Sequence, residues 1–285
     1  MKGKGCSGME FNMGFELKER QGVWYCVIPS FERTGLVSHG FSTRKGGVSG
    51  QQYSTLNLGF KKGDSCDAVM QNFLRFCRAL DINPHNTVFS DQVHSDKVAV
   101  VGAGDRGKGA FKESDILQVD GLMTQEPQVA LVTFYADCVP LFFLDPVRRA
   151  IALSHAGWRG TIARIGAKTL EGMRRMFGTR PEECLIGIGP SIGPCCFEVD
   201  FPVAEQFAKV FDKYKDIIIK PGQKPGRYYV NLWMANALQL EEMGIPHHNI
   251  TVADMCTSCN HDLFFSHRRD KGNTGRMAAL LMLKG

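Results

Sequence analysis

Apolar residues recur at helical spacing in several stretches of the chain. Val69, Phe73 and Cys77 fall on one face of such a stretch, because residues three or four apart share a helix face. Gly244 and Pro246 are a strong helix stop, so another helix ends just before them. The spacing predicts helices over 67–80, 161–177, 202–213, 231–243 and 275–283.

Short apolar runs bounded by turn residues predict strands over 128–134, 140–144, 150–154, 184–188, 249–253 and 262–266. Strands and helices do not alternate regularly, which favours an α+β fold of mixed sheets flanked by helices over a doubly wound sheet. Between about 115 and 155 the breaks are too short for a helical crossover, so antiparallel pairing is expected there.

The chain has 285 residues, 44% of them hydrophobic, which is enough to bury a large core. It shows no internal repeat and no Pro/Ser-rich linker. We expect a single domain over residues 31–285 and leave the role of the N-terminal segment 1–30 open. The pattern does not decide between a monomer and a homodimer.

The formal net charge is +5, and the lysines and arginines are scattered rather than gathered in a stripe. This disfavours nucleic acid as a partner, whereas a small anion such as phosphate fits the mild positive charge. The first twenty residues lack the apolar core of a secretory signal, and no apolar run reaches the length of a membrane span. We expect a cytoplasmic protein without a membrane partner.

Residues that could bind a metal lie beside apolar runs in three segments, DQVH, ADCVP and SHAGWRGT. They place His94, Cys138 and His155 at predicted strand ends. Two imidazoles and a thiolate can hold a catalytic zinc ion and leave its fourth position free. However, these residues form no short-spacing zinc motif, and on spacing alone a buried His beside a core Cys is the stronger interpretation.

Ten cysteines in a reducing compartment are expected to be buried thiols, metal ligands or nucleophiles. Cys256 and Cys259 form a CxxC pair, but no further cysteine follows to complete a zinc ribbon. Cys195 and Cys196 are adjacent, and neighbouring cysteines rarely pair because the geometry is strained. We predict that both pairs are buried structural thiols.

Two Gly-rich turns, 41–47 and 187–194, could cradle an anion, although neither matches a P-loop. Arg159 lies near the N-terminus of the predicted helix 161–177, where an anion is favoured. The basic stretch 266–276 is equally compatible with a phosphate loop and with a solvated turn.

Nine segments taken together resemble the YfiH-like family, which is also described as the laccase-domain or multicopper polyphenol oxidase family. In chain order they are FSTRKGGVS, STLNLG, DQVHSDKV, VDGLMT, YADCVPLFF, SHAGWRGT, IGPSIGPCCFEV, DMCTSC and FFSHRRDKGNTGRMAAL. They extend from residue 41 to residue 280, nearly the whole chain. One departure is Ser95, where many members have Gly.

The resemblance implies that His94, Cys138 and His155 are the metal ligands and catalytic residues, with zinc as the metal and copper as the alternative. It implies a fold similar to that of the toxin-type cysteine hydrolases. It also implies a purine nucleoside phosphorylase that splits adenosine, inosine and methylthioadenosine with phosphate, and that deaminates adenosine.

Four further residues are candidates for contacts with the substrate. Arg44, Arg159 and Arg276 could neutralise the phosphate charge. Deamination needs a carboxylate that carries protons, and Asp137 beside Cys138 is the candidate.

Two other functions remain open at this point. Cys138 could be a nucleophile with His155 as its base, in a hydrolase or amidase that edits peptidoglycan precursors. Alternatively, a single copper ion on the same ligands could oxidise phenols. A trinuclear copper cluster is disfavoured, because the chain has only 8 histidines and no His-x-His pair.

Overall fold

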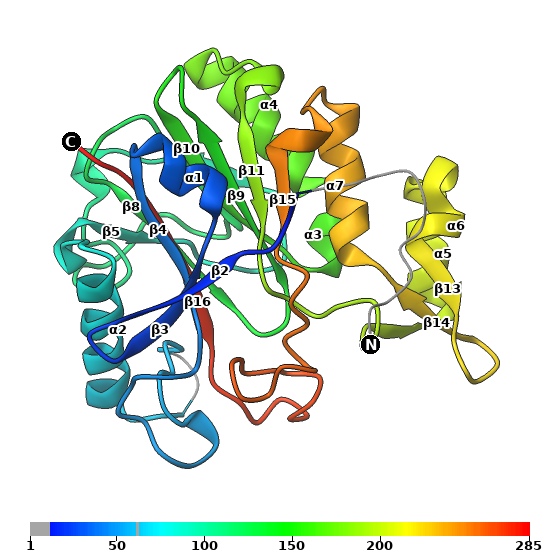
Figure 1. Cartoon of the computed structure of the whole chain (residues 1–285), viewed down its shortest axis with the longest axis horizontal. Coiled ribbons are helices and arrows are strands. Elements are labelled where there is room, and N and C mark those ends of the chain that lie inside the picture. Colours follow the sequence, from blue (N-terminus) through cyan, green and yellow to red (C-terminus); the bar gives the residue numbers. More distant parts are fainter. Residues whose placement is uncertain (1–11, 61–62) are drawn as a thin grey trace.

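The computed structural model describes residues 12–60 and 63–285. Its two large β-sheets lie between outer helices (Figure 1). The first sheet has seven strands, in the order β1 (Asn12–Met13), β15 (Ile250–Val252), β11 (Leu185–Ile188), β9 (Val139–Asp145), β10 (Ala150–Ala156), β7 (Gly121–Thr124) and β6 (Val98–Val100).

The second sheet has six strands, in the order β2 (Glu16–Arg20), β3 (Val23–Val27), β4 (Val37–Ser42), β16 (Met277–Leu283), β8 (Ala130–Tyr135) and β5 (Thr87–Phe89). Its pairs are antiparallel apart from β5 with β8. The chain passes from this sheet to the first one directly after β8, through the short turn that leads into β9.

A core fills the space between the two sheets. Phe142 and Leu144 of β9 belong to the same buried cluster as Leu281 of β16. Leu141 and Phe143, the alternate residues of β9, belong to a second cluster under the helices. Successive side chains of a strand point to opposite faces, so β9 is buried on both of them.

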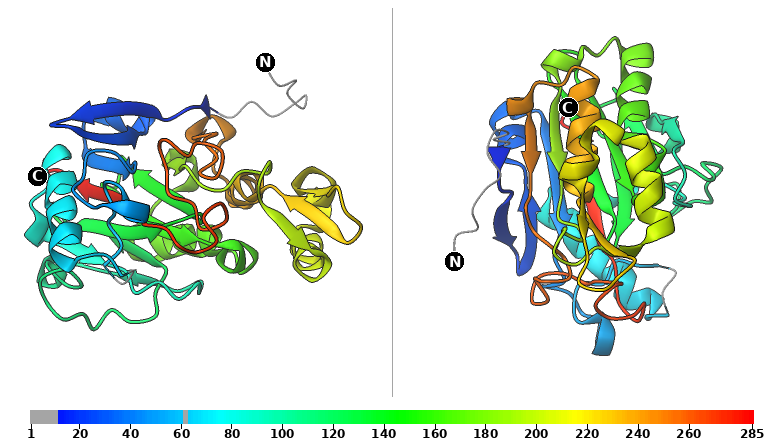
Figure 2. Two further views of the ribbon diagram at one scale, coloured as in Figure 1. Left: turned by 90° about the horizontal axis from the view of Figure 1, so that it is seen from below. Right: turned by 90° about the vertical axis from the view of Figure 1, so that its right-hand side faces the viewer.

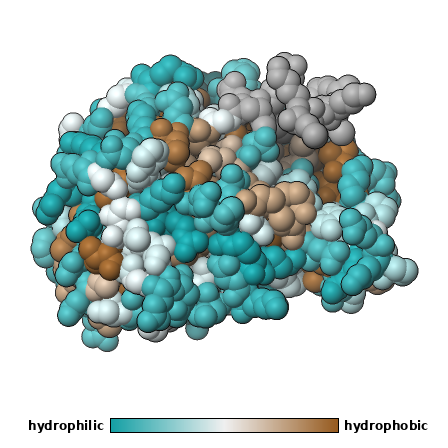
Figure 3. Space-filling model, turned by 60° about the horizontal axis from the view of Figure 1, so that its bottom comes forward, coloured by the Kyte–Doolittle hydropathy of each residue, from teal (hydrophilic) through white to brown (hydrophobic). Residues whose placement is uncertain are grey.

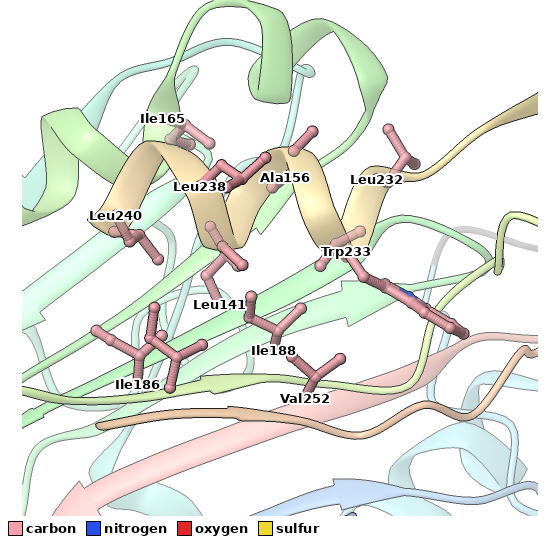
Figure 4. Packing of buried hydrophobic residues seen from close by; sticks show 14 of the residues in the cluster. Leu141, Ala156, Ile165, Ile186, Ile188, Leu232, Trp233, Leu238, Leu240 and Val252 are labelled. Carbon is pink, nitrogen blue, oxygen red and sulfur yellow. The ribbon is translucent and has the colours of Figure 1, made fainter. Parts of the chain in front are cut away.

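Helices cover the outer face of each sheet. Helix α2 (Cys66–Ala79) packs on the six-stranded sheet through residues such as Phe73 and Phe76. Helices α4 (Ile165–Phe177) and α7 (Leu232–Glu242) pack on the seven-stranded sheet. Figure 4 shows Leu238 and Leu240 of α7 above the β-strand residues Leu141, Ile186 and Ile188.

A smaller three-stranded sheet projects from one end of the molecule (Figure 2). It consists of β12 (Glu198–Asp200), β14 (Arg227–Val230) and β13 (Ile219–Pro221), with α5 (Phe201–Val210) and α6 (Lys215–Ile218) beside it. The remaining helices are α1 (Pro29–Thr34) and α3 (Trp158–Ile162). Short 3₁₀ segments cover Gln51–Tyr53, Pro84–Asn86, Ala103–Asp105, Pro181–Glu183, Asp212–Tyr214 and His247–Asn249.

The α+β class and most predicted elements are confirmed, and the pairing of β7, β10 and β9 is antiparallel as expected. The predicted helices 67–80, 202–213 and 231–243 correspond to α2, α5 and α7. The strands predicted over 128–134, 140–144, 150–154, 184–188 and 249–253 correspond to β8, β9, β10, β11 and β15. The likeness to the toxin-type cysteine hydrolases stays a prediction.

The helix predicted over 275–283 is wrong, because these residues contain strand β16, which crosses the middle of the molecule (red in Figure 1). Every residue of β16 is buried, since β4 and β8 pair with its edges and apolar clusters cover both of its faces. A strand buried on both faces is a continuous apolar run, and such a run has no period that separates it from a helix.

The predicted helix 161–177 is confirmed over α4 but not at its start. Arg164, whose backbone is left-handed with a φ of 61°, interrupts it, so that α3 ends before α4 begins. One more predicted element is wrong. The predicted strand 262–266 is an irregular segment, although Phe264 and Phe265 within it are fully buried. Adjacent buried residues form a short apolar run, and such a run resembles a buried strand even where the backbone is irregular.

Strands β1–β3 come from the segment 1–30, and β2 and β3 pair into the same sheet as β4. The division of the chain at residue 30 stays a prediction, and residues 1–11 lie outside the described residues. None of the described helices is long and apolar enough to cross a membrane. Hydrophilic residues dominate the face of the molecule seen in Figure 3, with hydrophobic ones in small groups among them.

Candidate metal centre and active-site cleft

Cys138 and His155 are brought together by two antiparallel strands. Cys138 immediately precedes β9, and His155 lies near the end of β10. The register pairs His155 with Pro140 and Ala156 with Val139, so the start of β9 lies beside the end of β10. Two residues that are distant in the sequence therefore share one end of the seven-stranded sheet.

His94 lies in the loop between β5 and β6, in a left-handed backbone conformation with a φ of 63°. The buried carboxylate of Asp120 holds this loop. It accepts backbone N–H hydrogen bonds from Val93 at 3.1 Å, His94 at 3.0 Å and Ser95 at 2.6 Å. A non-glycine residue in this conformation is strained, and these three bonds offset the strain.

The candidate ligand atoms of His94, Cys138 and His155 all lie within 4.8 Å of one another. The Sγ of Cys138 is 3.8 Å from the Nε2 of His94. Nitrogen and sulfur ligands of a tetrahedral zinc ion lie about 3.5 Å apart, given bond lengths of about 2.0 and 2.3 Å. The three donors therefore fit one zinc ion with little adjustment.

Gly157 leaves room for this centre. A Cβ at this position would lie 2.8 Å from the Cδ2 of His94 and 3.1 Å from the Sγ of Cys138. Any other residue would thus displace two of the three donors.

Asp120 also orients His155, whose Nδ1 lies 2.7 Å from a carboxylate oxygen of Asp120. This bond directs the Nε2 of His155 toward the other two ligands. A carboxylate behind a histidine is the usual support for a metal-binding imidazole. Asp120 thus fixes both histidines of the set, one through the ring and one through the backbone.

The charges of the centre favour a thiolate. Burial alone would raise the pKa of Cys138, but the neighbouring His155 and His94 outweigh it and lower that pKa to about 6. Burial opposes the charged form of His155 as well, yet Cys138 and Asp120 raise the pKa of His155 to about 9. The thiolate is the form of cysteine that binds metals and attacks electrophiles.

The centre lies in a cleft of about 770 Å³. One wall is aromatic and contains Phe60, Phe89 and Phe134, whose rings contact one another edge to face or tilted. A cleft of this size suits a small-molecule ligand, and an aromatic wall suits a flat apolar ring.

Arginines form another part of the lining. Arg159 and Arg276, both predicted as substrate contacts, line the cleft, and so does Arg268. The exposed guanidinium of Arg159 lies 4.4 Å from the ring centre of Trp158 and pairs with no carboxylate in the described part of the chain. Arg159 lies within α3, which is only five residues long, rather than at the start of a long helix as expected.

Arg44 does not line the cleft. Its guanidinium donates to the backbone carbonyls of Ser54 at 2.8 Å and His261 at 3.2 Å, and it lies over the ring of Phe265. These contacts hold the Gly-rich turn 41–47 against the loop that precedes β16.

Asp137 lines the cleft, and each of its carboxylate oxygens already accepts a hydrogen bond. The hydroxyl of Thr257 donates to one oxygen at 2.7 Å, and the backbone N–H of Arg268 donates to the other at 2.8 Å. Asp137 therefore joins the turn before β9 to two positions in the long loop between β15 and β16.

Sequence reasoning missed Asp120, Gly157 and Arg268. The signal for Asp120 was present, because it directly precedes an apolar strand in the segment VDGLMT, at the same end of the sheet as the ligands. No pattern in the sequence marks Gly157, since its role depends on the approach of His94 from a separate loop.

The prediction of buried structural thiols is wrong for Cys195 and Cys259, which are exposed. The second pair of cysteines that a zinc site needs lies upstream of Cys256 in the sequence, not downstream of Cys259. The fold brings Cys195 and Cys196 to the CxxC pair, and the four sulfur atoms lie within 4.8 Å of one another.

The fold and the site define the class, an α+β protein of two facing sheets with a His-Cys-His group that could hold a metal at one end. A family model described as multi-copper polyphenol oxidoreductase laccase matches residues 38–284. The chain belongs to this family, as the resemblance in its motifs predicted.

Several relatives carry the name of an activity. The chain is 37% identical over 265 residues to purine nucleoside phosphorylase YlmD of Geobacillus stearothermophilus, which covers 93% of this chain and 95% of the relative. It is 33% identical over 258 residues to purine nucleoside phosphorylase YfiH of Escherichia coli, covering 90% and 98%. It is 35% identical over 238 residues to adenosine deaminase RL5 of an unknown prokaryotic organism, covering 83% and 90%.

Solved structures agree with this assignment. The crystal structure of Bacillus licheniformis YfiH matches with a TM-score of 0.87 at 36% identity, covering 94% of this chain and 99% of that one. The crystal structure of YlmD from Geobacillus stearothermophilus matches with a TM-score of 0.85 at 35% identity. These matches confirm the mixed-sheet architecture.

The word multi-copper in the family description does not fit the donor groups. Among the described residues, groups of three or more potential ligands occur only as His94 with Cys138 and His155, and as the four cysteines. Neither group resembles a cluster of many histidines.

Proposed function

We propose that this chain is a zinc-dependent purine nucleoside phosphorylase that acts on adenosine, inosine and methylthioadenosine and also deaminates adenosine. The observation that carries the proposal is that the His94–Cys138–His155 centre lies in one cleft whose lining also includes an aromatic wall and arginine side chains. The names of the relatives support the reaction class.

The cleft contains groups suited to the phosphate, the ribosyl group and the purine base. In phosphorolysis the bond from the ribose C1′ to the purine nitrogen breaks, a bond from C1′ to a phosphate oxygen forms, and the base leaves with a proton. Positive charge develops on the sugar, as it does in glycoside hydrolysis. Bound zinc would supply positive charge that polarises an oxygen of phosphate or water.

The protein side chains position the two substrates. Arg159 is the best candidate for phosphate, because its planar fork can make two parallel hydrogen bonds and no carboxylate among the described residues competes for it. Arg276 lines the same cleft and adds a second positive charge. Arg44 donates its hydrogen bonds to Ser54 and His261, so we assign it a smaller part in phosphate binding than the sequence suggested.

The purine base fits the aromatic wall. Phe60, Phe89 and Phe134 offer ring faces and edges to a flat heterocycle and exclude water from it. For deamination we retain Asp137 as the proton carrier. Each carboxylate oxygen has two lone pairs, so the bonds from Thr257 and Arg268 still leave one free on each.

A Cys–His hydrolase is the second candidate. Asp120, His155 and Cys138 form a chain in which a carboxylate orients an imidazole and the imidazole lowers the pKa of a thiol. That arrangement is typical of an activated cysteine nucleophile. A single copper ion on the same donors is the redox alternative. Chelation distinguishes the zinc enzyme from the Cys–His hydrolase. Removing zinc should abolish the activity of the zinc enzyme, whereas it should leave the Cys138 thiol of a hydrolase free to react.

The proposal is tested by Arg159→Lys, assayed with adenosine in both reactions on one preparation. Lysine keeps the charge and loses the bidentate fork. Because one charge-assisted hydrogen bond contributes about 1.5–3 kcal/mol, the phosphate KM should rise, or kcat fall, about tenfold or more. Deamination uses water in place of phosphate and should change less.

Zinc content and the ratio of adenine to inosine are measured on the same samples. Arg175→Lys, an exposed arginine on α4 outside the cleft, is the matched control and should match the wild type. Equal losses in both reactions would assign Arg159 to the nucleoside or to the fold and would move the phosphate role to Arg276.

A further inference from the structure

A second cluster of cysteines lies outside the His94–Cys138–His155 centre. It consists of Cys195 and Cys196 in the loop between β11 and β12, and of Cys256 and Cys259 in the loop after β15. All four sulfur atoms lie within 4.8 Å of one another. We refer to it as the four-cysteine cluster.

We propose that the four-cysteine cluster binds one zinc ion, which fastens the two loops together. Four thiolates around one ion form a typical structural zinc site. Sulfur atoms at the corners of a tetrahedron lie about 3.8 Å apart when the metal–sulfur bonds are about 2.3 Å long. In this structure the Sγ of Cys259 lies 3.5 Å from that of Cys195 and 3.4 Å from that of Cys196.

The compactness of the cluster selects a single ion. An iron–sulfur cluster places iron and inorganic sulfide between its cysteines and needs them further apart than one shared ion does. A disulfide needs sulfur atoms about 2.05 Å apart, and it would use two of the four thiols and leave the others without a role. Structural zinc sites often have four sulfur ligands in a closed tetrahedron, and four sulfur atoms within 4.8 Å of one another can occupy its corners.

The backbone prepares both loops for this arrangement. Cys195 and Cys196 lie in a turn, which allows neighbouring side chains to face the same point, whereas a strand would send them to opposite faces. Ser191 pairs with Cys256 as an isolated β-bridge, and the backbone N–H of Gly193 donates to the Sγ of Cys256 at 3.2 Å. Such N–H donors stabilise a thiolate ligand.

Gly193 is needed for this close approach. A Cβ there would lie 3.1 Å from the Cβ of Cys256 and 2.8 Å from the ring of Trp233. The side chain of Arg268 then joins the cluster to the cleft, because its guanidinium donates to the carbonyl of Cys196 at 3.1 Å while its backbone N–H donates to Asp137. The ion would thus brace one wall of the cleft without touching the substrate.

Zinc content per chain, measured by elemental analysis of protein purified under reducing conditions, tests this inference. Wild-type protein should hold two zinc ions, and the double variant Cys195→Ser/Cys259→Ser should hold one. Cys66→Ser removes an exposed thiol at the start of α2 and is the matched control, which should keep two.

Cys138→Ser distinguishes this cluster from the other centre. It should lose the zinc ion of the His94–Cys138–His155 centre and keep the one in the cluster. If that centre held no metal, wild type and Cys138→Ser would each hold one ion and the double variant none, which would still support the cluster. Cobalt substitution gives a second readout, since strong sulfur-to-cobalt absorption should survive Cys138→Ser and largely vanish in the double variant.

Three results would overturn the inference. One is a zinc content that the double variant leaves unchanged although it folds with a wild-type circular dichroism spectrum. Another is stoichiometric iron in place of zinc. The third is a disulfide among the four cysteines, detected by mass spectrometry after alkylation without reduction.

Discussion

Asp120 connects two of the three candidate ligands through one buried carboxylate. It accepts a hydrogen bond from the ring of His155 and another from the backbone of His94, so one side chain sets both imidazoles. Burial alone would raise the pKa of Asp120, but hydrogen bonds and the charge of His155 lower it, and Asp120 stays ionised. The ligand geometry therefore depends on a residue that does not bind the metal.

Replacing Asp120 by Asn should weaken zinc binding at this centre about 10- to 100-fold, as loss of an outer carboxylate does in other metal sites. Competition with a chromogenic chelator measures the affinity, with Cys138→Ser as the baseline. Asp115→Asn, whose side chain is 77% exposed, is the control and should bind like the wild type. Unchanged affinity in Asp120→Asn would refute this role.

His39 is a buried histidine held neutral. Burial is the main reason that its pKa is lowered to about 3, and its Nε2 accepts the backbone N–H of Ile28 at 2.8 Å. Between pH 6.5 and pH 3 the unfolded chain binds a proton at His39 and the folded chain does not. Stability is therefore lost as the pH falls through this window, by about 1.4 kcal/mol per pH unit.

The free energy of unfolding of the wild type, measured by denaturant titration, should thus fall more between pH 7 and pH 5 than that of His39→Gln. The expected difference between the two falls is about 2 kcal/mol, from the part of this interval below the ordinary histidine pKa. His85→Gln, at an exposed position, should keep the wild-type dependence. Parallel pH profiles for wild type and His39→Gln would contradict a neutral buried His39.

Among the elements, strands were predicted correctly where turn residues bounded a short apolar run, and the prediction failed at β16 although its burial is like that of β9 and β10. The strands β8, β9 and β10 were predictable because short polar breaks separate their apolar runs. Strand β16 was not, because its run MAALLML has no period and consists of Met, Ala and Leu, which are strong helix formers. The break at Arg164 was invisible for a related reason, since apolar residues continue on both sides of it.

The candidate site was also predictable only in part. Strand ends gave the position of Cys138 and His155, but the choice of the ligand set came from the family resemblance and not from spacing. The four-cysteine cluster was missed because its two halves are about sixty residues apart, and only the pairing of β11 with β15 brings their loops together.

Shortening a buried side chain of strand β16 should destabilise the protein, because these side chains pack against both sheets. Leu281 is fully buried between them, so Leu281→Ala should leave a cavity and cost about 2–5 kcal/mol of unfolding free energy. Denaturant unfolding measures the change. Leu117→Ala, at a position that is 63% exposed, is the control and should change stability by less than about 0.5 kcal/mol. Similar losses in the two variants would contradict the central position of β16.

At the scale of the whole molecule, the cleft lies where the chain crosses from one sheet to the other. The turn between β8 and β9 carries Asp137 and Cys138, so residues of both sheets face the same space. The six-stranded sheet contributes Phe89 and Phe134 to the aromatic wall, and the seven-stranded sheet contributes the candidate metal ligand His155. The two-sheet architecture therefore places an aromatic wall and the candidate metal centre in the same cleft.

The central claim is that this centre transfers the ribosyl group of a purine nucleoside to phosphate with the help of zinc. It is tested most directly by incubating zinc-loaded protein with adenosine, with and without phosphate, and quantifying adenine, ribose 1-phosphate and inosine. We predict equal amounts of adenine and ribose 1-phosphate, formed only with phosphate and lost on chelation or in Cys138→Ser. Adenine released at the same rate without phosphate, or activity that survives complete removal of the metal, would contradict it.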